Sequence, residues 1–250
     1  MSIDKFDGRA KDYSVSRPGY SLELIESMYN NYGLSNTSVI ADVGSGTGKF
    51  SKHLLDRGSY VFGIEPNKDM RTIAENKLSK YTNFHSVEGN EKNMSIENNA
   101  VDCITVAQAF HWFDVRKFKE ECIRVTKSSS KAFLIWNVRE QSDSINKEWH
   151  EIFVQYCPNF NGFSNGIKQD DEKIRCFFDK GYDYVEYNYP LTFDRESFIK
   201  RSLSSSYSLK ESDKNYKLYI EKLNNLFDKY KCNDAISIAN KTVAYIGCIK

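Results

Sequence analysis

The sequence predicts an α/β protein built on a mostly parallel sheet with helices on both faces. Over the first 140 residues, short runs that are apolar almost throughout alternate with segments of helical spacing. Strands of this kind are buried on both faces, which is typical of parallel sheets in β-α-β folds. The 250 residues are 40% hydrophobic, which suits one large domain or one domain with a lid and excludes collagen-like and disordered chains.

The predicted elements of the first half follow one another in alternation. Strand character is found in residues 38–43, 60–64, 83–87, 101–107 and 132–137. Helical spacing is found in residues 49–57, 67–80 and 115–125. This alternation carries the prediction of a parallel sheet.

The second half has a less regular pattern. Further helices are expected at residues 143–156, 170–180, 195–203 and 212–230, and further strands at 184–193 and 242–249. We expect the two strands to end an open sheet and the helices to form a lid rather than a separate domain. The predicted organisation is a single domain over residues 1–250, with a cofactor-binding core at 1–140, lid and substrate-side insertions at 141–232, and the last strand at 233–250.

The charge and hydropathy of the chain exclude several classes of binding partner. Lys and Arg total 35 against 34 Asp and Glu, a formal charge of +1, so the chain lacks the basic field that nucleic-acid binders use. No apolar run approaches the ~18 residues of a membrane helix, and residues 1–9 lack a hydrophobic stretch for a signal peptide. The six cysteines include no C-x-x-C pair, which argues against a zinc site. We expect a cytoplasmic protein with no metal, no membrane contact and no nucleic-acid partner.

The most informative segment is the glycine-rich turn that follows the first strand. Residues 39–48 (VIADVGSGTG) run from a strand into a G-x-G-x-G turn before a helix, where free backbone N–H groups can bind an anion. The dinucleotide fingerprint G-x-G-x-x-G would need a glycine at Lys49. Glu65 closes the second strand 21 residues after Gly44, where a carboxylate can accept hydrogen bonds from ribose hydroxyls. The pattern predicts a ribose-containing ligand and leaves nucleotide and amino-acid ligands open.

Four segments carry a family resemblance. These are residues 42–48 (DVGSGTG), 63–67 (GIEPN), 87–91 (VEGNE) and 101–114 (VDCITVAQAFHWFD). The chain resembles class I S-adenosylmethionine-dependent methyltransferases over residues 6–139, within the type 11 group that includes small-molecule enzymes similar to trans-aconitate methyltransferase. The resemblance implies a Rossmann-like, seven-stranded sheet with an antiparallel last strand and the cofactor across the carboxyl ends of the first strands.

The resemblance also implies roles for individual residues. The glycines of the turn pass beneath the methionine portion of the cofactor, Asp42 orients the loop or the cofactor amine, and Glu65 holds the ribose. Glu91 stands where the group commonly has a small residue, so its contact is expected through the backbone. The implied cofactor-binding residues are Arg17, Asp42, Gly44, Ser45, Gly46, Gly48, Glu65, Pro66, Met70, Asn90, Glu91, Gln108 and Ala109.

Arg17 belongs to a short amino-terminal segment, residues 17–20 (RPGY), that also matches the group's pattern. A guanidinium suits the cofactor carboxylate, and the alternative is a surface Arg before a helix-starting proline.

Methyl transfer from a sulfonium is an in-line displacement, so the protein mainly has to place the acceptor and exclude water. Among the four histidines His111 is the one placed for chemistry, as a general base or as a wall of the pocket. Arg139 is a candidate for neutralising an acidic substrate, or a solvated loop residue. The aromatic residues expected near the mouth of the site, some of which must instead be core, are Tyr13, Tyr20, Phe110, Trp112, Trp136 and Tyr207.

The leading hypothesis is an enzyme that methylates O, N or C of a small molecule with S-adenosylmethionine. An RNA methyltransferase is the rival enzyme, although it would want a basic groove or an RNA-binding module. A cofactor-binding protein without turnover is the alternative from another class.

Overall fold

The computed structural model describes residues 18–163, 171–205 and 207–250. The expected Tyr13 and Arg17 contacts lie outside these residues. The elements are α2 (Leu22–Asn30), β1 (Val39–Val43), α3 (Lys49–Asp56), β2 (Tyr60–Ile64), α4 (Lys68–Leu78), β3 (Phe84–Val87), β4 (Val101–Ala107), η2 (Phe110–Trp112), α5 (Val115–Val125), β5 (Thr126–Arg139), α6 (Ser144–Tyr156), α7 (Glu172–Phe177), β6 (Asp183–Asn188), β7 (Leu191–Asp194), α8 (Arg195–Leu203), α9 (Tyr216–Tyr230), β8 (Ala235–Ile238) and β9 (Asn240–Cys248).

The main sheet confirms the predicted fold class. Its seven strands lie in the order β3-β2-β1-β4-β5-β9-β6, and β9 runs antiparallel to both of its neighbours. The order reverses between β1 and β4, so the loops after these strands open a crevice at the carboxyl edge of the sheet, where ligands of such folds bind.

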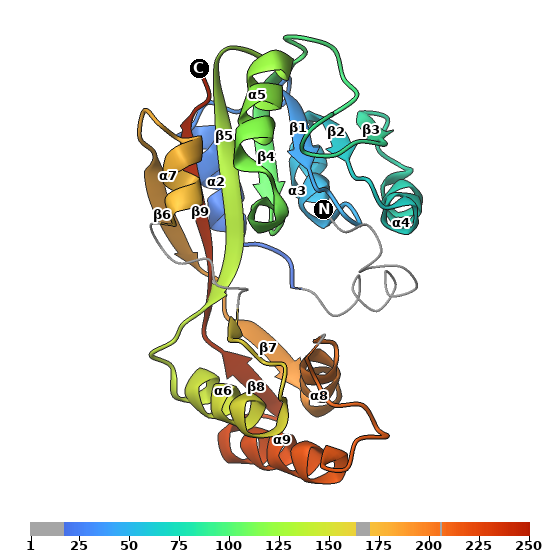
Figure 1. Cartoon of the computed structure of the whole chain (residues 1–250), viewed down its shortest axis with the longest axis vertical. Helices are drawn as coiled ribbons and strands as arrows, with labels where there is room; N and C mark the ends of the chain where they lie inside the picture. The colour runs from blue at the N-terminus through green and yellow to red at the C-terminus, as the bar shows by residue number, and fades with distance from the viewer. Residues whose placement is uncertain (1–17, 164–170, 206) are drawn as a thin grey trace.

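Helices cover both faces of this sheet, because each presents an apolar stripe to it (Figure 1). On one face Phe118 of α5 and Phe177 of α7 stack with ring centroids 5.1 Å apart. On the other face α2 and α3 bury Leu24, Met28 and Leu54 completely. The sheet is therefore shielded on both sides, as the apolar strands predicted.

A second lobe lies beyond the long strand β5 (Figure 1), and among the described residues it is joined to the core between β5 and α6, between β6 and β7 and between β8 and β9. This helical lobe consists of α6, α8 and α9 with the two-stranded antiparallel sheet of β7 and β8. It has its own apolar cluster, in which Trp149, Phe198 and Tyr219 are almost wholly buried. The predicted lid helices 143–156, 195–203 and 212–230 correspond to α6, α8 and α9.

The strand expected at residues 184–193 is two strands in the structure. β6 pairs with β9 in the main sheet, whereas β7 pairs with β8 in the helical lobe. Pro190 separates them, and proline has no N–H with which to continue a ladder. Residues 172–188 therefore lie against the core rather than in the lobe, although they fall within the range 141–232 expected as lid and insertions.

Asn146 links two of the chain segments that cross between the core and the helical lobe. Its side-chain Nδ2 donates to the backbone oxygens of Glu140 and Ala239, at 3.0 and 2.7 Å, and the residue is 3% exposed. We expect Asn146→Ala to lower the free energy of unfolding by about 1–3 kcal/mol, because two partly buried hydrogen bonds are lost. Thermal melting measures the loss, and Asn225→Ala on the exposed face of α9 is the matched control with almost no expected effect. An equal melting temperature for both variants would show that Asn146 does not hold the crossings.

Candidate active site

The glycine-rich turn joins β1 to α3 in left-handed backbone conformations. The φ angles of Gly44, Gly46 and Gly48 are +72°, +56° and +73°. A Cβ on Gly44 would lie 2.6 Å from the Cβ of Ala109, whereas a Cβ on Gly46 would meet no atom within 4 Å. Gly46 thus faces open space, a cradle that a side chain would begin to fill.

A cavity of about 950 Å³, including its open mouth, lies beside this turn. The expected site residues that line it are Tyr20, Asp42, Gly44, Ser45, Gly46, Gln108 and Arg139.

Asp42 lines this cavity and is 1% exposed. Its carboxylate accepts hydrogen bonds from the hydroxyls of Ser51 (2.6 Å) and Thr105 (2.9 Å). Burial raises the pKa of Asp42 to about 6, and the two hydroxyls oppose that rise. The group therefore changes its charge slightly below neutral pH.

This pKa predicts a pH-dependent affinity for the cofactor product. Below about pH 6 a protonated Asp42 cannot pair with an ammonium group, and above it the carboxylate can. We expect calorimetry to show that S-adenosylhomocysteine binds more tightly as the pH rises through 6. Asp42→Asn should abolish this dependence, whereas Asp69→Asn, an exposed substitution on α4, should retain it. An affinity that falls over this interval in the unaltered chain would exclude the role of Asp42.

Glu65 follows β2 and is 4% exposed. Its two carboxylate oxygens accept the backbone N–H groups of Gly46 and Asn67, each at 3.0 Å. Burial raises the pKa of Glu65, while these backbone hydrogen bonds lower it. The carboxylate thus ties the glycine-rich turn to the start of α4, and since it has further lone pairs it can also accept ribose hydroxyls. Its ribose contact stays a prediction.

Like Glu65, the residues expected around the adenine lie outside the lining of the cavity. Pro66 follows Glu65, and Met70 is buried in the first turn of α4. The side-chain oxygen of Asn90 accepts the N–H groups of Lys92 and Asn93, and Glu91 is 2% exposed. Their adenine contacts therefore stay predictions.

Gln108 follows β4 with a φ of +61°, unusual for a residue with a side chain. Its N–H donates to the carbonyl of Ile135, and its side-chain amide lies 3.4 Å from the carbonyl oxygen of Asn137. This conformation positions Gln108 in the cavity wall and Ala109 against Gly44.

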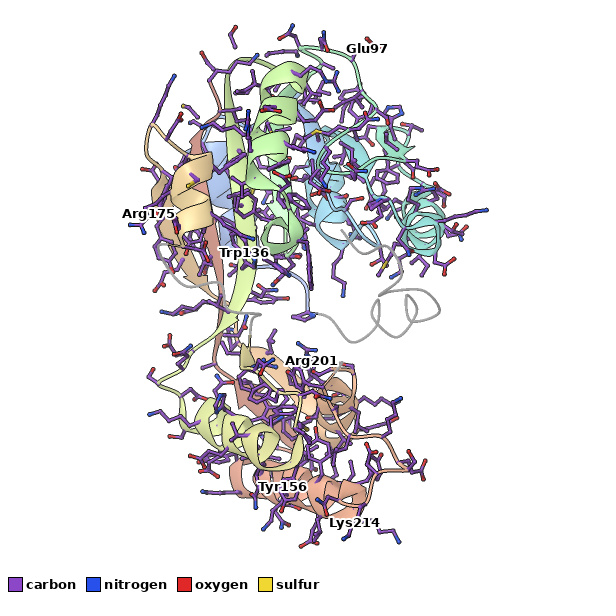
Figure 2. The ribbon with its side chains drawn as sticks, in the orientation of Figure 1. Glu97, Trp136, Tyr156, Arg175, Arg201 and Lys214 are labelled. Atoms are coloured by element: carbon purple, nitrogen blue, oxygen red, sulfur yellow. The ribbon has the colours of Figure 1, made fainter. Side chains whose placement is uncertain are left out.

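The expected aromatic residues divide between the cavity and the two cores. Tyr20 lines the cavity and packs edge-on against Phe50, with ring centroids 5.0 Å apart. Phe110 and Trp136 are 1% and 2% exposed and pack on each other; Figure 2 labels Trp136. Tyr207 packs on Phe153 in the helical lobe. Of these aromatic residues, only Tyr20 is brought to the cavity beside the turn.

His111 lies on η2 with its ring centroid 4.7 Å from that of the exposed Trp112. Its backbone carbonyl is 3.4 Å from the Lys173 ammonium. Neither His111 nor Trp112 belongs to the cavity lining found in the described residues. The catalytic role of His111 stays a prediction.

Sequence reasoning missed several residues that the fold brings to the cavity. Asn137 donates to the carbonyl of Gly19 and accepts from the hydroxyl of Thr242, each at 2.7 Å. Its place two residues before Arg139, at the end of an apolar strand, was a usable signal. Arg201 comes from α8 and lies at the end of the helical lobe that faces the core (Figure 2). No local pattern signals it. The missed lining residues of interest are Lys49, Asn137, Leu191, Arg201 and Asn240.

The geometry defines an α/β protein with a cavity beside the glycine-rich turn at the carboxyl edge of its sheet. Residues 41–134 match the methyltransferase domain family. A methyltransferase-like protein of Schizosaccharomyces pombe is 23% identical over 98% of this chain and 95% of its own length. A methyltransferase of Mycobacterium bovis is 29% identical over 61% of this chain and 59% of its own length.

The solved structures show the same fold. YcgJ from Bacillus subtilis superposes with a TM-score of 0.57 and 18% identity, over 91% of this chain and 98% of its own. YjhP from Escherichia coli superposes with a TM-score of 0.54 and 13% identity, over 96% of this chain and 97% of its own.

Residues 41–134 thus form a methyltransferase domain, and the relatives along the chain support an S-adenosylmethionine-dependent methyltransferase. S-adenosylmethionine is its cofactor, and the open cradle at Gly46 fits this group. Within the described residues, no helix is both long and apolar enough to cross a lipid bilayer.

Proposed function

We propose that this enzyme transfers a methyl group to an anionic small molecule, with a carboxylate oxygen as the acceptor. The observation that carries the proposal is the charge of the cavity. Lys49, Arg139 and Arg201 contribute three cationic side chains to its described lining, and Asp42 contributes the one carboxyl group. The cofactor has a sulfonium, an ammonium and a carboxylate, so it adds further positive charge. A negatively charged acceptor is complementary to a cavity lined by these cationic side chains.

The chemistry of an ionised acceptor suits these residues. When bound, S-adenosylmethionine supplies a methyl group that is activated by the positive sulfur. A carboxylate needs no general base, because it has no proton to lose. Arg139 and Arg201 would orient the acceptor oxygen by hydrogen bonds, and the helical lobe, which contributes Leu191 and Arg201, would exclude water. The contact between the Gln108 side-chain amide and the Asn137 carbonyl would hold the part of the cavity wall that these two residues form.

Methyl transfer to a panel of small carboxylic acids, followed with methyl-labelled cofactor, tests this function. We expect a labelled methyl ester as the product. Mild alkali should hydrolyse this ester and release labelled methanol. We expect Arg201→Gln to raise the KM for the acid about 10- to 100-fold, because a charge-assisted contact is lost, while the Kd of S-adenosylhomocysteine changes little. Arg116→Gln, on the exposed face of α5, is the control.

Three results would contradict the proposal. Methylation of amines but not of acids would assign a different acceptor. Methylation of RNA would support the rival enzyme. Tight S-adenosylhomocysteine binding without any methyl transfer would support a cofactor-binding protein without turnover.

The cytoplasmic location and the lack of a nucleic-acid partner stay predictions.

A further inference from the structure

Residues 18–21, which we call the Tyr20 segment, form part of the wall of the cavity beside the glycine-rich turn. Pro18 and Tyr20 are among the lining residues. The side chain of Tyr20 is buried and packs edge-on against Phe50 in the first turn of α3. Because α3 begins where the glycine-rich turn ends, the Tyr20 ring lies close to the backbone on which we expect the cofactor.

Three hydrogen bonds connect this segment to the main sheet through two side chains, Asn137 of β5 and Thr242 of β9. These two residues are partners across the antiparallel pair of strands. Asn137 Nδ2 donates to the carbonyl oxygen of Gly19 at 2.7 Å, and the Thr242 hydroxyl donates to Asn137 Oδ1 at 2.7 Å. The N–H of Ser21 donates to Thr242 Oγ1 at 3.0 Å. Both chain neighbours of Tyr20 are thus held by the sheet.

The donor and acceptor roles in these three hydrogen bonds fix one arrangement. The Gly19 carbonyl can only accept, so the Asn137 amide directs Nδ2 toward it and Oδ1 toward Thr242. The Thr242 hydroxyl accepts from Ser21, and it has one proton to donate to Oδ1. Thr242 and Ser21 are both buried, so breaking one of these bonds would leave a buried polar group without its partner.

Further contacts define the position of the Tyr20 segment. A Cβ on Gly19 would lie 2.9 Å from the hydroxyl oxygen of Tyr189, so the backbone is seated closely at this point. Burial raises the pKa of Tyr189, whereas a hydrogen bond from the Gly19 backbone opposes that rise. The carbonyl oxygen of Asn137 lies 3.4 Å from the side-chain amide of Gln108 in the cavity wall. Asn137 therefore joins the Tyr20 segment to a second part of the same wall.

We propose that Thr242 is a positioning residue for the cofactor, because its hydroxyl, acting through Asn137 and Ser21, holds Tyr20 in the cavity wall. Thr242 does not belong to the cavity lining found among the described residues, so its effect on the ligand is indirect. The held segment presents the Tyr20 ring to the cofactor, and binding does not have to order this part of the wall. The inference goes beyond the proposed function, because it concerns the cofactor and does not depend on which acceptor is methylated.

Calorimetry with S-adenosylhomocysteine on Thr242 variants of the full chain tests the inference. Thr242→Val removes the hydroxyl and keeps the shape of the side chain. We expect this variant to raise the Kd about five- to tenfold, a change typical of the loss of one or two hydrogen bonds. Thr242→Ser keeps the hydroxyl and should leave the Kd within about twofold of that of the unaltered chain.

Thr126→Val is the matched control for the loss of a buried hydroxyl. Thr126 is fully buried at the start of β5, outside the cavity lining, and its hydroxyl donates to the carbonyl oxygen of Cys122 at 2.7 Å. Both valine variants should lower the melting temperature by similar amounts, whereas only Thr242→Val should lose affinity. In a Tyr20→Leu background, Thr242→Val should cause little further loss of affinity, because both substitutions act on the same part of the wall.

Several results would overturn the inference. These are an unchanged Kd in Thr242→Val, an equal loss of affinity in Thr126→Val, no recovery of affinity in Thr242→Ser, and fully additive effects of Tyr20→Leu and Thr242→Val. Failure of S-adenosylhomocysteine to bind the unaltered chain would contradict the cofactor site and the inference with it.

If Thr242→Val does not fold, hydrogen exchange of the unaltered chain tests the inference instead. S-adenosylhomocysteine should slow exchange of the Ser21 amide, which donates to Thr242, because the ligand favours the held segment. The Ile249 amide, which donates to Ser130 beyond the opposite end of β9, is the internal control and should slow less. Equal slowing of both amides would overturn the inference.

Discussion

Gly46→Ala is expected to weaken S-adenosylhomocysteine binding at least about tenfold while the chain stays folded. The Cβ of alanine would meet no protein atom within 4 Å and would project into the open space beside the turn. We expect the cofactor to occupy this space, because glycine there would let the backbone approach the ligand closely. Calorimetry measures the loss of affinity.

Gly33→Ala is a matched control for the backbone strain. Gly33 has a φ of +86°, and its Cβ would also meet no atom within 4 Å, but it lies after α2 and outside the lining of the cavity. Both variants place alanine in the left-handed region of backbone conformation, which lowers the free energy of unfolding by about 1–2 kcal/mol in each variant. The melting temperatures should therefore fall by similar amounts while only Gly46→Ala loses affinity. Equal cofactor affinities would place the ligand away from the turn.

Glu65→Gln should weaken cofactor binding by about 1–3 kcal/mol and also lower the melting temperature. The glutamine NH2 group would face one of the two backbone N–H groups that the carboxylate now accepts, from Gly46 and Asn67. A donor would thus oppose a donor in a buried position, and a charge-assisted ribose contact would be lost. Glu75→Gln, an exposed substitution on α4, should change neither quantity. Unchanged S-adenosylhomocysteine affinity in Glu65→Gln would mean that the ribose is held elsewhere.

The prediction for Glu65 differs from what its sequence position suggests. An acid at the end of a strand is expected to contact the ligand without supporting the fold, so its removal would hardly alter stability. The structure adds the hydrogen bonds to Gly46 and Asn67, which no spacing in the sequence specifies. We therefore expect ligand binding and local stability to be coupled through the Glu65 carboxylate.

The main sheet could be predicted because its signals are local. Apolar runs at residues 38–43, 60–64 and 101–107 became β1, β2 and β4, and the glycine-rich turn became the left-handed turn after β1. The strand β8 and the division of residues 184–193 were missed. β7 and β8 are four residues each, and their pairing across about 40 intervening residues leaves no periodic signal.

The site was less accessible to sequence reasoning than the fold. Arg201 reaches the cavity from α8, more than 150 residues after Gly44, so only tertiary packing brings them together. The aromatic segment around Phe110 has a strong local pattern, but this pattern has two structural interpretations. A dense aromatic run predicts either a pocket or a core. Phe110, the first residue of η2, belongs to the core, where its ring packs on Phe118 and Phe177.

Titration of the full chain with S-adenosylhomocysteine and with NAD⁺ tests the assignment of the glycine-rich turn most directly. The G-x-G-x-G turn with Lys49 in place of the third dinucleotide glycine, and Glu65 tied to Gly46, predict one binding site for S-adenosylhomocysteine, displaced by S-adenosylmethionine, and no binding of NAD⁺. Saturable binding of NAD⁺ with none of S-adenosylhomocysteine would contradict it.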